Sequence, residues 1–206
     1  MNQLANLFVV AGPSGVGKTK LVEALLNLSL GLEKSISFTT RPKRSGEVEG
    51  SNYHFIDKRQ FQIMIEKNDF LEHALVFDHY YGTNRSWVMN HLEKGRDVLL
   101  EIDWQGAQSI RQTFPEAITI FILPPSRAVL EKRLIGRGQD SDAVIAARMS
   151  KAIAEISHYH EFDYLIINQD FDQALAEISK IVETQRLRCA CQAQIHRQLL
   201  SDLLSL

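Results

Sequence analysis

The chain has 206 residues, of which 45% are hydrophobic and 23% charged, with a formal net charge of −2. This composition suits one buried core with inserted segments, and its near-neutral charge argues against a general nucleic-acid or membrane-surface binder. No apolar run approaches the roughly 18 residues of a membrane span, and the N-terminus lacks the basic region of a signal peptide. We therefore expect a cytoplasmic protein with no nucleic-acid or membrane partner.

The first motif along the chain is GPSGVGKT at residues 12–19, directly after the apolar run LFVVA at 7–11. It matches G-x-x-x-x-G-K-[ST], in which backbone N–H groups turn toward a phosphate chain, the lysine reaches the β- and γ-phosphates and the hydroxyl ligates Mg²⁺. A buried strand before the loop and a helix after it favour this interpretation over an ordinary glycine-rich turn. The motif predicts bound ATP or GTP with Mg²⁺. The loop residues are Gly12, Pro13, Ser14, Gly15, Val16, Gly17, Lys18 and Thr19.

Apolar strands and amphipathic helices alternate along the rest of the chain, which is typical of a doubly wound parallel α/β sheet. The expected strands are residues 7–11, 97–103, 117–123 and 163–167. The expected helices are residues 18–29, 84–94, 104–113, 126–135 and 142–158.

Three stretches depart from this alternation. Residues 35 to 76 contain short alternating runs, a glycine-rich turn and a short helix around FQIMI, which predict an insertion with partly antiparallel strands. The polar stretch GRGQDSD at 136–142 lies between two helices and is interpreted as a lid. The chain from residue 171 onward is expected to form two amphipathic helices. Its end, beyond Gln185, is either an oligomer contact or a flexible tail.

The two cysteines, Cys189 and Cys191, lie in this last stretch. Two positions apart on a helix, they point to different sides, which suits neither a disulfide nor a paired metal site. We expect both to be reduced, as is usual in the cytoplasm.

Three classes of phosphate-loop protein compete. A regulatory GTPase would carry D-x-x-G and N-K-x-D; DWQG at 103–106 fits the first, but no N-K-x-D or T-K-x-D occurs downstream. A binding module would have no reason to keep the loop lysine, glycines and hydroxyl together. The third class, a small phosphotransferase, is favoured by the inserted segment.

That segment, SISFTTRPKRSGEVEGSNYHF at residues 35–55, resembles the GMP-binding segment of guanylate kinases. FLEHA, YYGT, LEIDWQG, RLIGRGQDS and INQDFDQAL follow in the family's order and spacing. The resemblance covers residues 5 to 185, and the bacterial type also has the C-terminal helical extension. Departures are minor: Thr19-Lys20 replaces the commoner Ser-Ser, and Ser51-Asn52 stands where Lys-Asp is usual.

The resemblance implies a P-loop nucleoside monophosphate kinase that catalyses ATP + GMP = ADP + GDP with Mg²⁺, and dGMP is a further expected acceptor. It also implies an organisation in four parts. These are a core at 1–34 and 84–185, an inserted mixed β/α GMP-binding subdomain at 35–83, a small lid at 136–148 within the core, and a C-terminal helical extension at 186–206, through which a homo-oligomer could form.

The chemistry of guanine supports the same assignment. A carboxylate can accept hydrogen bonds from guanine N1–H and the N2 amino group, a hydroxyl can donate to O6, and arginines can bind the phosphate bidentately. Glu72 is the expected carboxylate, and Ser37 and Thr83 the expected hydroxyls. The resemblance adds two tyrosines at the phosphate and an aspartate at the guanine edge. The predicted GMP site comprises Ser37, Arg41, Arg44, Tyr53, Glu72, Tyr81, Gly82, Thr83 and Asp103.

Phosphoryl transfer requires in-line placement and positive charge around the migrating group. Lys18, Arg41, Arg137 and Arg148 are the predicted catalytic cations. Thr19 is the expected protein ligand of Mg²⁺, and Glu101 and Asp103, at the end of the predicted strand 97–103, could hold the ion through water. By resemblance, Asn168 lies near the adenine of ATP.

Overall fold

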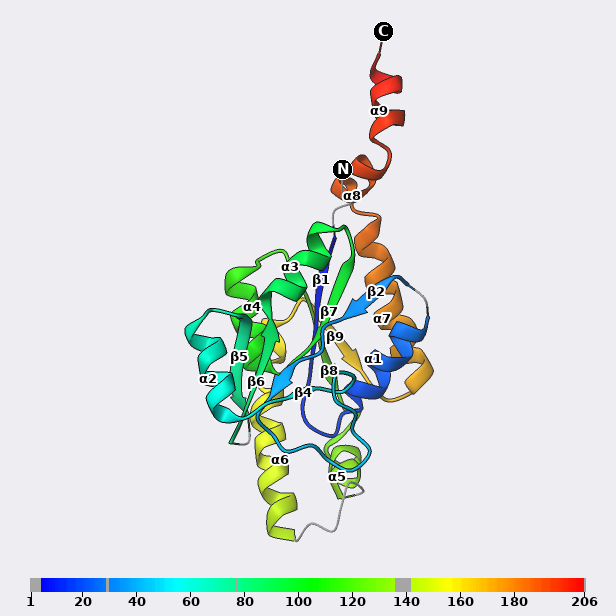
Figure 1. The fold of residues 1–206 in the computed structure, drawn as a ribbon. Coiled ribbons are helices and arrows are strands. Elements are labelled where there is room, and N and C mark those ends of the chain that lie inside the picture. Colours follow the sequence, from blue (N-terminus) through cyan, green and yellow to red (C-terminus); the bar gives the residue numbers. More distant parts are fainter. Residues whose placement is uncertain (1–4, 29, 77, 136–141, 206) are drawn as a thin grey trace.

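The computed structural model describes residues 5–28, 30–76, 78–135 and 142–205. Its centre is a five-stranded sheet in the order β2-β7-β1-β8-β9, in which every pair of neighbours is parallel (Figure 1). The doubly wound α/β fold predicted from the sequence is thereby confirmed. The five strands are β1 (Leu7–Ala11), β2 (Leu32–Lys34), β7 (Asp97–Glu101), β8 (Ile118–Leu123) and β9 (Tyr164–Ile167).

Helices cover both faces of this sheet because its strands are apolar on both sides. In β1, Phe8 and Val10 point into one core, beneath α1 (Lys18–Asn27) and α7 (Phe171–Arg186). Leu7, Val9 and Ala11 point the opposite way, into a second core beneath α3 (Arg85–Glu93) and α4 (Trp104–Thr113). The carboxyl ends of the strands therefore remain open to ligands.

A second, four-stranded sheet stands beside the first, in the order β4-β3-β6-β5. Its β3–β4 pair is parallel and the other pairs are antiparallel, so the expected insertion of short, partly antiparallel strands is confirmed. The short helix α2 (Lys58–Glu66) begins at a capping box of Asp57 and Gln60, and its Phe61 stacks on Phe70 of the sheet. The strands are β3 (Phe38–Thr39), β4 (His54–Phe55), β5 (Phe70–Val76) and β6 (His79–Asn84).

Two features of the central sheet differ from the prediction. Strand β2 was not predicted, because three half-buried residues are too short to show a period. The strand predicted at 97–103 ends at Glu101. Asp103 lies beyond it as the N-cap of α4, where its carboxylate accepts a hydrogen bond from Gly106 N at 3.0 Å. DWQG is therefore the start of a helix, with its aspartate as the cap.

Helices α5 (Arg127–Ile135) and α6 (Asp142–Ile156) extend from the end of the molecule opposite the C-terminus (Figure 1). The helix predicted over 142–158 is therefore two residues shorter, and a single 3₁₀ turn, Tyr159–Glu161, follows it. Residues 136–141 of the expected lid lie outside the described residues. The lid assignment therefore remains a prediction.

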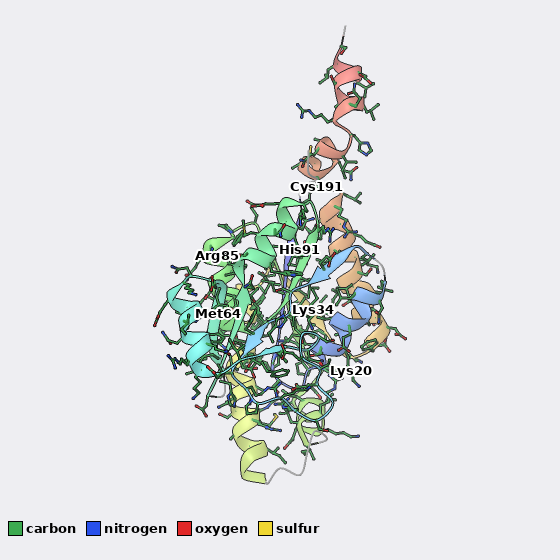
Figure 2. The ribbon with its side chains drawn as sticks, in the orientation of Figure 1. Lys20, Lys34, Met64, Arg85, His91 and Cys191 are labelled. Atoms are coloured by element: carbon green, nitrogen blue, oxygen red, sulfur yellow. The ribbon has the colours of Figure 1, made fainter. Side chains whose placement is uncertain are left out.

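The C-terminal segment forms three helices where two were expected: α7, α8 (Cys189–Ile195) and α9 (Arg197–Leu204). Helices α8 and α9 extend away from the two sheets (Figure 1). Cys191 is buried at the base of this extension and Cys189 is exposed, as expected for residues on different sides of one helix (Figure 2). Among the described residues, no helix combines the length and apolar character needed to cross a bilayer.

Candidate active site

A cavity of about 240 Å³ lies where the carboxyl ends of β1 and β7 face the second sheet. It brings together the whole phosphate loop and most of the residues predicted to bind GMP or Mg²⁺. Residues 12–19, Glu101 and Asp103 line it from the central sheet. Ser37, Arg44, Tyr53, Glu72 and Tyr81 line it from the second sheet. One space therefore reaches the candidate binding residues of both sheets.

The phosphate loop requires glycine at two close approaches. Gly12 has φ 153°, and a Cβ there would lie 2.5 Å from the carbonyl oxygen of Ile122. Gly17 has φ 95°, and its Cβ would lie 2.7 Å from Asn168 Nδ2. Helix α1 begins at the next residue, Lys18, so its free N–H groups and positive dipole end face the cavity. The loop is shaped as an anion site.

Asn168 and Arg133 support this loop from behind. Asn168 is buried, and its Nδ2 donates to the Val16 carbonyl at 2.7 Å. Arg133 donates to the same carbonyl at 3.0 Å and to the Asn168 carbonyl at 3.2 Å. The predicted contact of Asn168 with adenine remains a prediction. Arg133, on α5, had no motif that could have identified it.

Lys18 and Thr19 are held by the last residue of β7 and the residue that follows it. Lys18 Nζ donates to the Ile102 carbonyl at 2.8 Å, and Thr19 Oγ1 donates to Glu101 Oε1 at 2.5 Å. Burial alone would raise the pKa of Glu101, but the charges of Lys34 and Lys18 outweigh it and lower the pKa below its usual value. Glu101 is therefore an ionised carboxylate.

This donor set suits Mg²⁺, which is usually bound by one or two protein oxygens together with phosphates and water. The Thr19 hydroxyl donates a hydrogen bond to Glu101, so its oxygen lone pairs remain available to a cation. Asp103 lines the same cavity. Within the described part of the chain, no group of three His, Cys, Asp or Glu side chains forms a metal site by itself. Phosphate oxygens would have to complete the coordination.

Glu72 is a buried carboxylate, only 6% exposed, at the wall of the cavity. Its cross-strand partner Thr83 donates from Oγ1 to Glu72 Oε1 at 2.5 Å. Gly106 leaves room for the other oxygen, since a Cβ there would lie 2.6 Å from Glu72 Oε2. Burial, with a smaller contribution from Asp103, raises the pKa of Glu72 to about 7. The Thr83 hydroxyl, predicted to face guanine O6, holds Glu72 in this structure.

Gly82, the neighbouring predicted residue, lies in β6 against the aromatic rings of Phe70 and Phe61. A Cβ at Gly82 would lie 2.8 Å from the Phe70 ring, so a larger residue would displace that aromatic side chain. Gly82 thus leaves room for the aromatic packing of Phe70 on this face of the sheet.

The predicted phosphate-binding arginines share one carboxylate, Glu47, which was not predicted from the sequence. Arg41 Nη2 contacts Glu47 Oε1 at 2.6 Å, and the Arg44 backbone N–H donates to Glu47 Oε2 at 2.8 Å. The Arg41 guanidinium also lies over the Tyr53 ring, 5.4 Å from its centroid. Burial raises the pKa of Tyr53 to about 12, so its phenol remains a hydrogen-bond donor. An acidic residue within the basic turn RPKRSGE was the signal for Glu47.

One cavity residue comes from helix α6. The Ser14 backbone N–H donates to Glu155 Oε2 at 3.1 Å, and burial raises the pKa of Glu155. Arg148 is half-buried on the same helix, and its spacing of seven residues from Glu155 places both on one face. That spacing was the signal for Glu155, which was not predicted. Arg137 lies outside the described residues.

A phosphate loop after β1, followed by a helix and facing a carboxylate at the end of β7, defines a P-loop nucleotide-binding enzyme. The chain belongs to the guanylate kinase family, whose model matches residues 4–185.

Individual relatives match over the whole chain. The chain is 52% identical over 206 residues to the guanylate kinase of Shewanella denitrificans, and 54% identical over 205 residues to that of Saccharophagus degradans, with 100% of both chains covered in each case. The crystal structure of guanylate kinase from Anaplasma phagocytophilum matches with a TM-score of 0.79 and 32% identity, covering 92% of this chain and 90% of that one.

Proposed function

We propose that the cavity between the two sheets is where this chain carries out ATP + GMP = ADP + GDP. The observation that carries this assignment is one cavity lined both by the phosphate loop and by the buried carboxylate Glu72. Triphosphate and guanine recognition thus face one space, as in-line transfer between two nucleotides requires.

The phosphate loop binds ATP in this proposal, with Lys18 at its β- and γ-phosphates and Asn168 supporting the loop near the adenine. Mg²⁺ binds Thr19 and the phosphates, with Glu101 and Asp103 acting through water. The ion supplies positive charge that offsets the charge of the phosphates.

GMP binds the second sheet in this proposal. Glu72 accepts from the guanine N1–H and N2 amino group, with Ser37 and Asp103 beside it. Arg41, Arg44, Tyr53 and Tyr81 bind the 5′-phosphate. Glu47 forms an ion pair with Arg41, so the phosphate must compete with this carboxylate for the guanidinium. None of these contacts uses the ribose hydroxyls, so we extend the proposal to dGMP.

A coupled assay of ADP release with ATP, Mg²⁺ and each nucleoside monophosphate in turn tests the proposal. ADP release that depends on GMP, and weakly if at all on AMP, CMP or UMP, is the expected result. A regulatory GTPase would release phosphate without an acceptor, and a binding module would show no turnover.

Changing Arg148 to alanine will lower kcat more than it raises the KM for GMP, by about tenfold to a hundredfold, because its proposed partner is the migrating phosphoryl group. The same holds for Arg137→Ala. Steady-state kinetics with both substrates varied measures the split. A rise in the KM for GMP with kcat unchanged would instead place Arg148 in the GMP site.

The C-terminal extension is the surface that we propose for self-association. Leu199, Leu203 and Leu204 of α9 are 53%, 71% and 83% exposed, and the helix lies apart from the two sheets (Figure 1). Removing residues 197–206 should leave kcat unchanged and reduce the mass measured by light scattering. A full-length chain that is monomeric at all concentrations would contradict this.

The free cysteines Cys189 and Cys191 suit the cytoplasm, where we place the protein.

A further inference from the structure

Lys34 is a basic residue beside the phosphate loop and is not among the residues predicted to bind nucleotide or Mg²⁺. It ends β2, at one edge of the central sheet, and is paired with Leu99 of β7. Glu101 is two residues beyond Leu99, so the side chains of Lys34 and Glu101 lie on the same face. Lys34 is labelled near the middle of the molecule in Figure 2. The strand pairing therefore brings an ammonium group to the carboxylate next to Thr19.

The contact between Lys34 and Glu101 is short and mostly shielded from water. Lys34 Nζ lies 2.7 Å from Glu101 Oε2, and the two side chains are only 18% and 11% exposed. The other carboxylate oxygen, Oε1, accepts from Thr19. Both oxygens of Glu101 are thus engaged, one by a cation and one by the hydroxyl that faces the phosphate site.

We propose that Lys34 is a positioning residue that holds Glu101 against the Thr19 hydroxyl and cancels the carboxylate charge, so that Mg²⁺ enters with nucleotide phosphates and not as a free ion. The proposal rests on the assignment of the phosphate loop to Mg²⁺ and ATP. The proposal concerns the positive charge of Lys34, which favours the binding of anionic ATP and disfavours the binding of a free metal cation.

The cavity already contains several carboxylates besides Glu101, namely Glu72, Asp103 and Glu155. Without Lys34, Glu101 would lose its ion-pair partner and add net negative charge next to Thr19. A nearby negative charge attracts a divalent cation and repels a triphosphate. Loss of Lys34 should therefore strengthen the binding of free metal and weaken the binding of ATP, and no simple loss of folding produces that pair of changes.

The test compares Lys34→Met with the unchanged protein in two binding measurements. Mn²⁺ binding without nucleotide is measured by electron paramagnetic resonance, and ATP binding without metal by calorimetry. We expect Mn²⁺ to bind about fivefold more tightly and ATP about fivefold more weakly, the size expected for one charge a few ångströms away in a partly hydrated site. Both changes should shrink as salt is raised.

Two further variants separate the effect of the Lys34 charge from the attachment of β2 to β7. Lys34→Arg keeps the charge and should restore both affinities. Arg96→Met removes an exposed ion pair, Arg96 Nη1 to Glu33 Oε1 at 3.1 Å, which also ties β2 to the start of β7. This control should change neither affinity. If the Met variant does not fold, Lys34→Gln, which keeps a hydrogen-bond donor but no charge, must show the same two opposite shifts.

The proposal is overturned if both affinities fall together, if neither changes, or if Arg fails to restore them. Neither measurement uses GMP or turnover, so failure of the proposed reaction would appear separately, in the ADP-release assay. Opposite shifts without GMP-dependent turnover would support the role of Lys34 and contradict the assignment of the reaction.

Discussion

Replacing Lys18 with alanine will lower kcat by about a thousandfold, with little change in the stability of the fold. A cation that faces developing phosphate charge in a water-excluded site is typically worth several kcal/mol in the transition state. In the structure, the half-buried Lys18 contributes one hydrogen bond, to the Ile102 carbonyl at 2.8 Å. Losing such a bond costs the fold only about 1 kcal/mol. Turnover and melting temperature of the purified variant measure the two effects.

Lys20→Ala is the matched control, because Lys20 is an exposed lysine in the first turn of the same helix (Figure 2). It should retain kcat within about twofold, since its charge is screened by solvent. Near-normal turnover of the Lys18 variant would refute its catalytic role. A matching loss in the Lys20 variant would show that the net charge of α1 matters more than the position of Lys18.

The core of the fold could be predicted because its elements carry local signals. Strands β1, β7, β8 and β9 are built around apolar runs, and the helices between them show apolar residues at helical spacing. Strand β2 could not be predicted, because its three residues owe their conformation to pairing with β7. The start of α8 at Cys189 also lacked a local signal, since no side chain caps it.

The candidate site also contains residues that could be predicted from the sequence and residues that could not. Motifs identify the residues expected to touch the substrates, because their types and spacing reflect the chemistry of phosphate and guanine. Glu47, Arg133 and Glu155 were not predicted, since each acts on another residue of the chain. Arg133 reaches Val16 across 117 positions and Glu155 reaches Ser14 across 141, and such pairings depend on the tertiary fold. Residues that position other residues carry little signal in a single sequence.

Several candidate ligand-binding groups are already engaged within the protein. Arg41 pairs with Glu47, Thr83 with Glu72, and the Ser14 N–H with Glu155. Buried or half-buried polar groups need partners, and at these three positions other residues of the chain supply them. Substrate binding must exchange these contacts for its own. Selectivity therefore depends on how well each nucleotide replaces them, and Glu72 is the sharpest case.

Changing Glu72 to glutamine will lower kcat/KM for GMP by about 2–4 kcal/mol, or roughly 30-fold to 1000-fold. The variant keeps the size of the side chain but places an amide donor where guanine also presents donors. Adenine has an unprotonated N1 acceptor at this edge, so AMP would set a lone pair against the carboxylate of the unchanged protein. A site built to hydrogen-bond one edge rejects the other by about 10⁴-fold or more.

The KM for ATP should hardly change, because in our assignment ATP binds the phosphate loop and not the second sheet. Ser37→Ala is a milder comparison in the same cavity: it removes a neutral hydroxyl and should cost only about 1 kcal/mol. If GMP efficiency falls less than threefold in the Gln variant, or if ATP binding falls equally, Glu72 does not recognise guanine.

The pH dependence provides a second test of Glu72, because burial raises its pKa to about 7. Guanine donors require the ionised form, so kcat/KM for GMP should rise with pH up to about 7 and then level off, and the Gln variant should lack this rise.

The raised pKa of Glu72 affects the free energy of unfolding in the opposite direction. A folded-state pKa raised from 4.5 to about 7 gives stability that is full below the unfolded pKa and is lost as pH rises through 7, in total about 3 kcal/mol. Denaturant unfolding without ligand should therefore show the unchanged protein losing stability between pH 5 and pH 8 relative to the Gln variant. Parallel stability profiles for the two proteins would mean that Glu72 is already ionised at low pH. In that case no rise of kcat/KM for GMP with pH would be expected from Glu72.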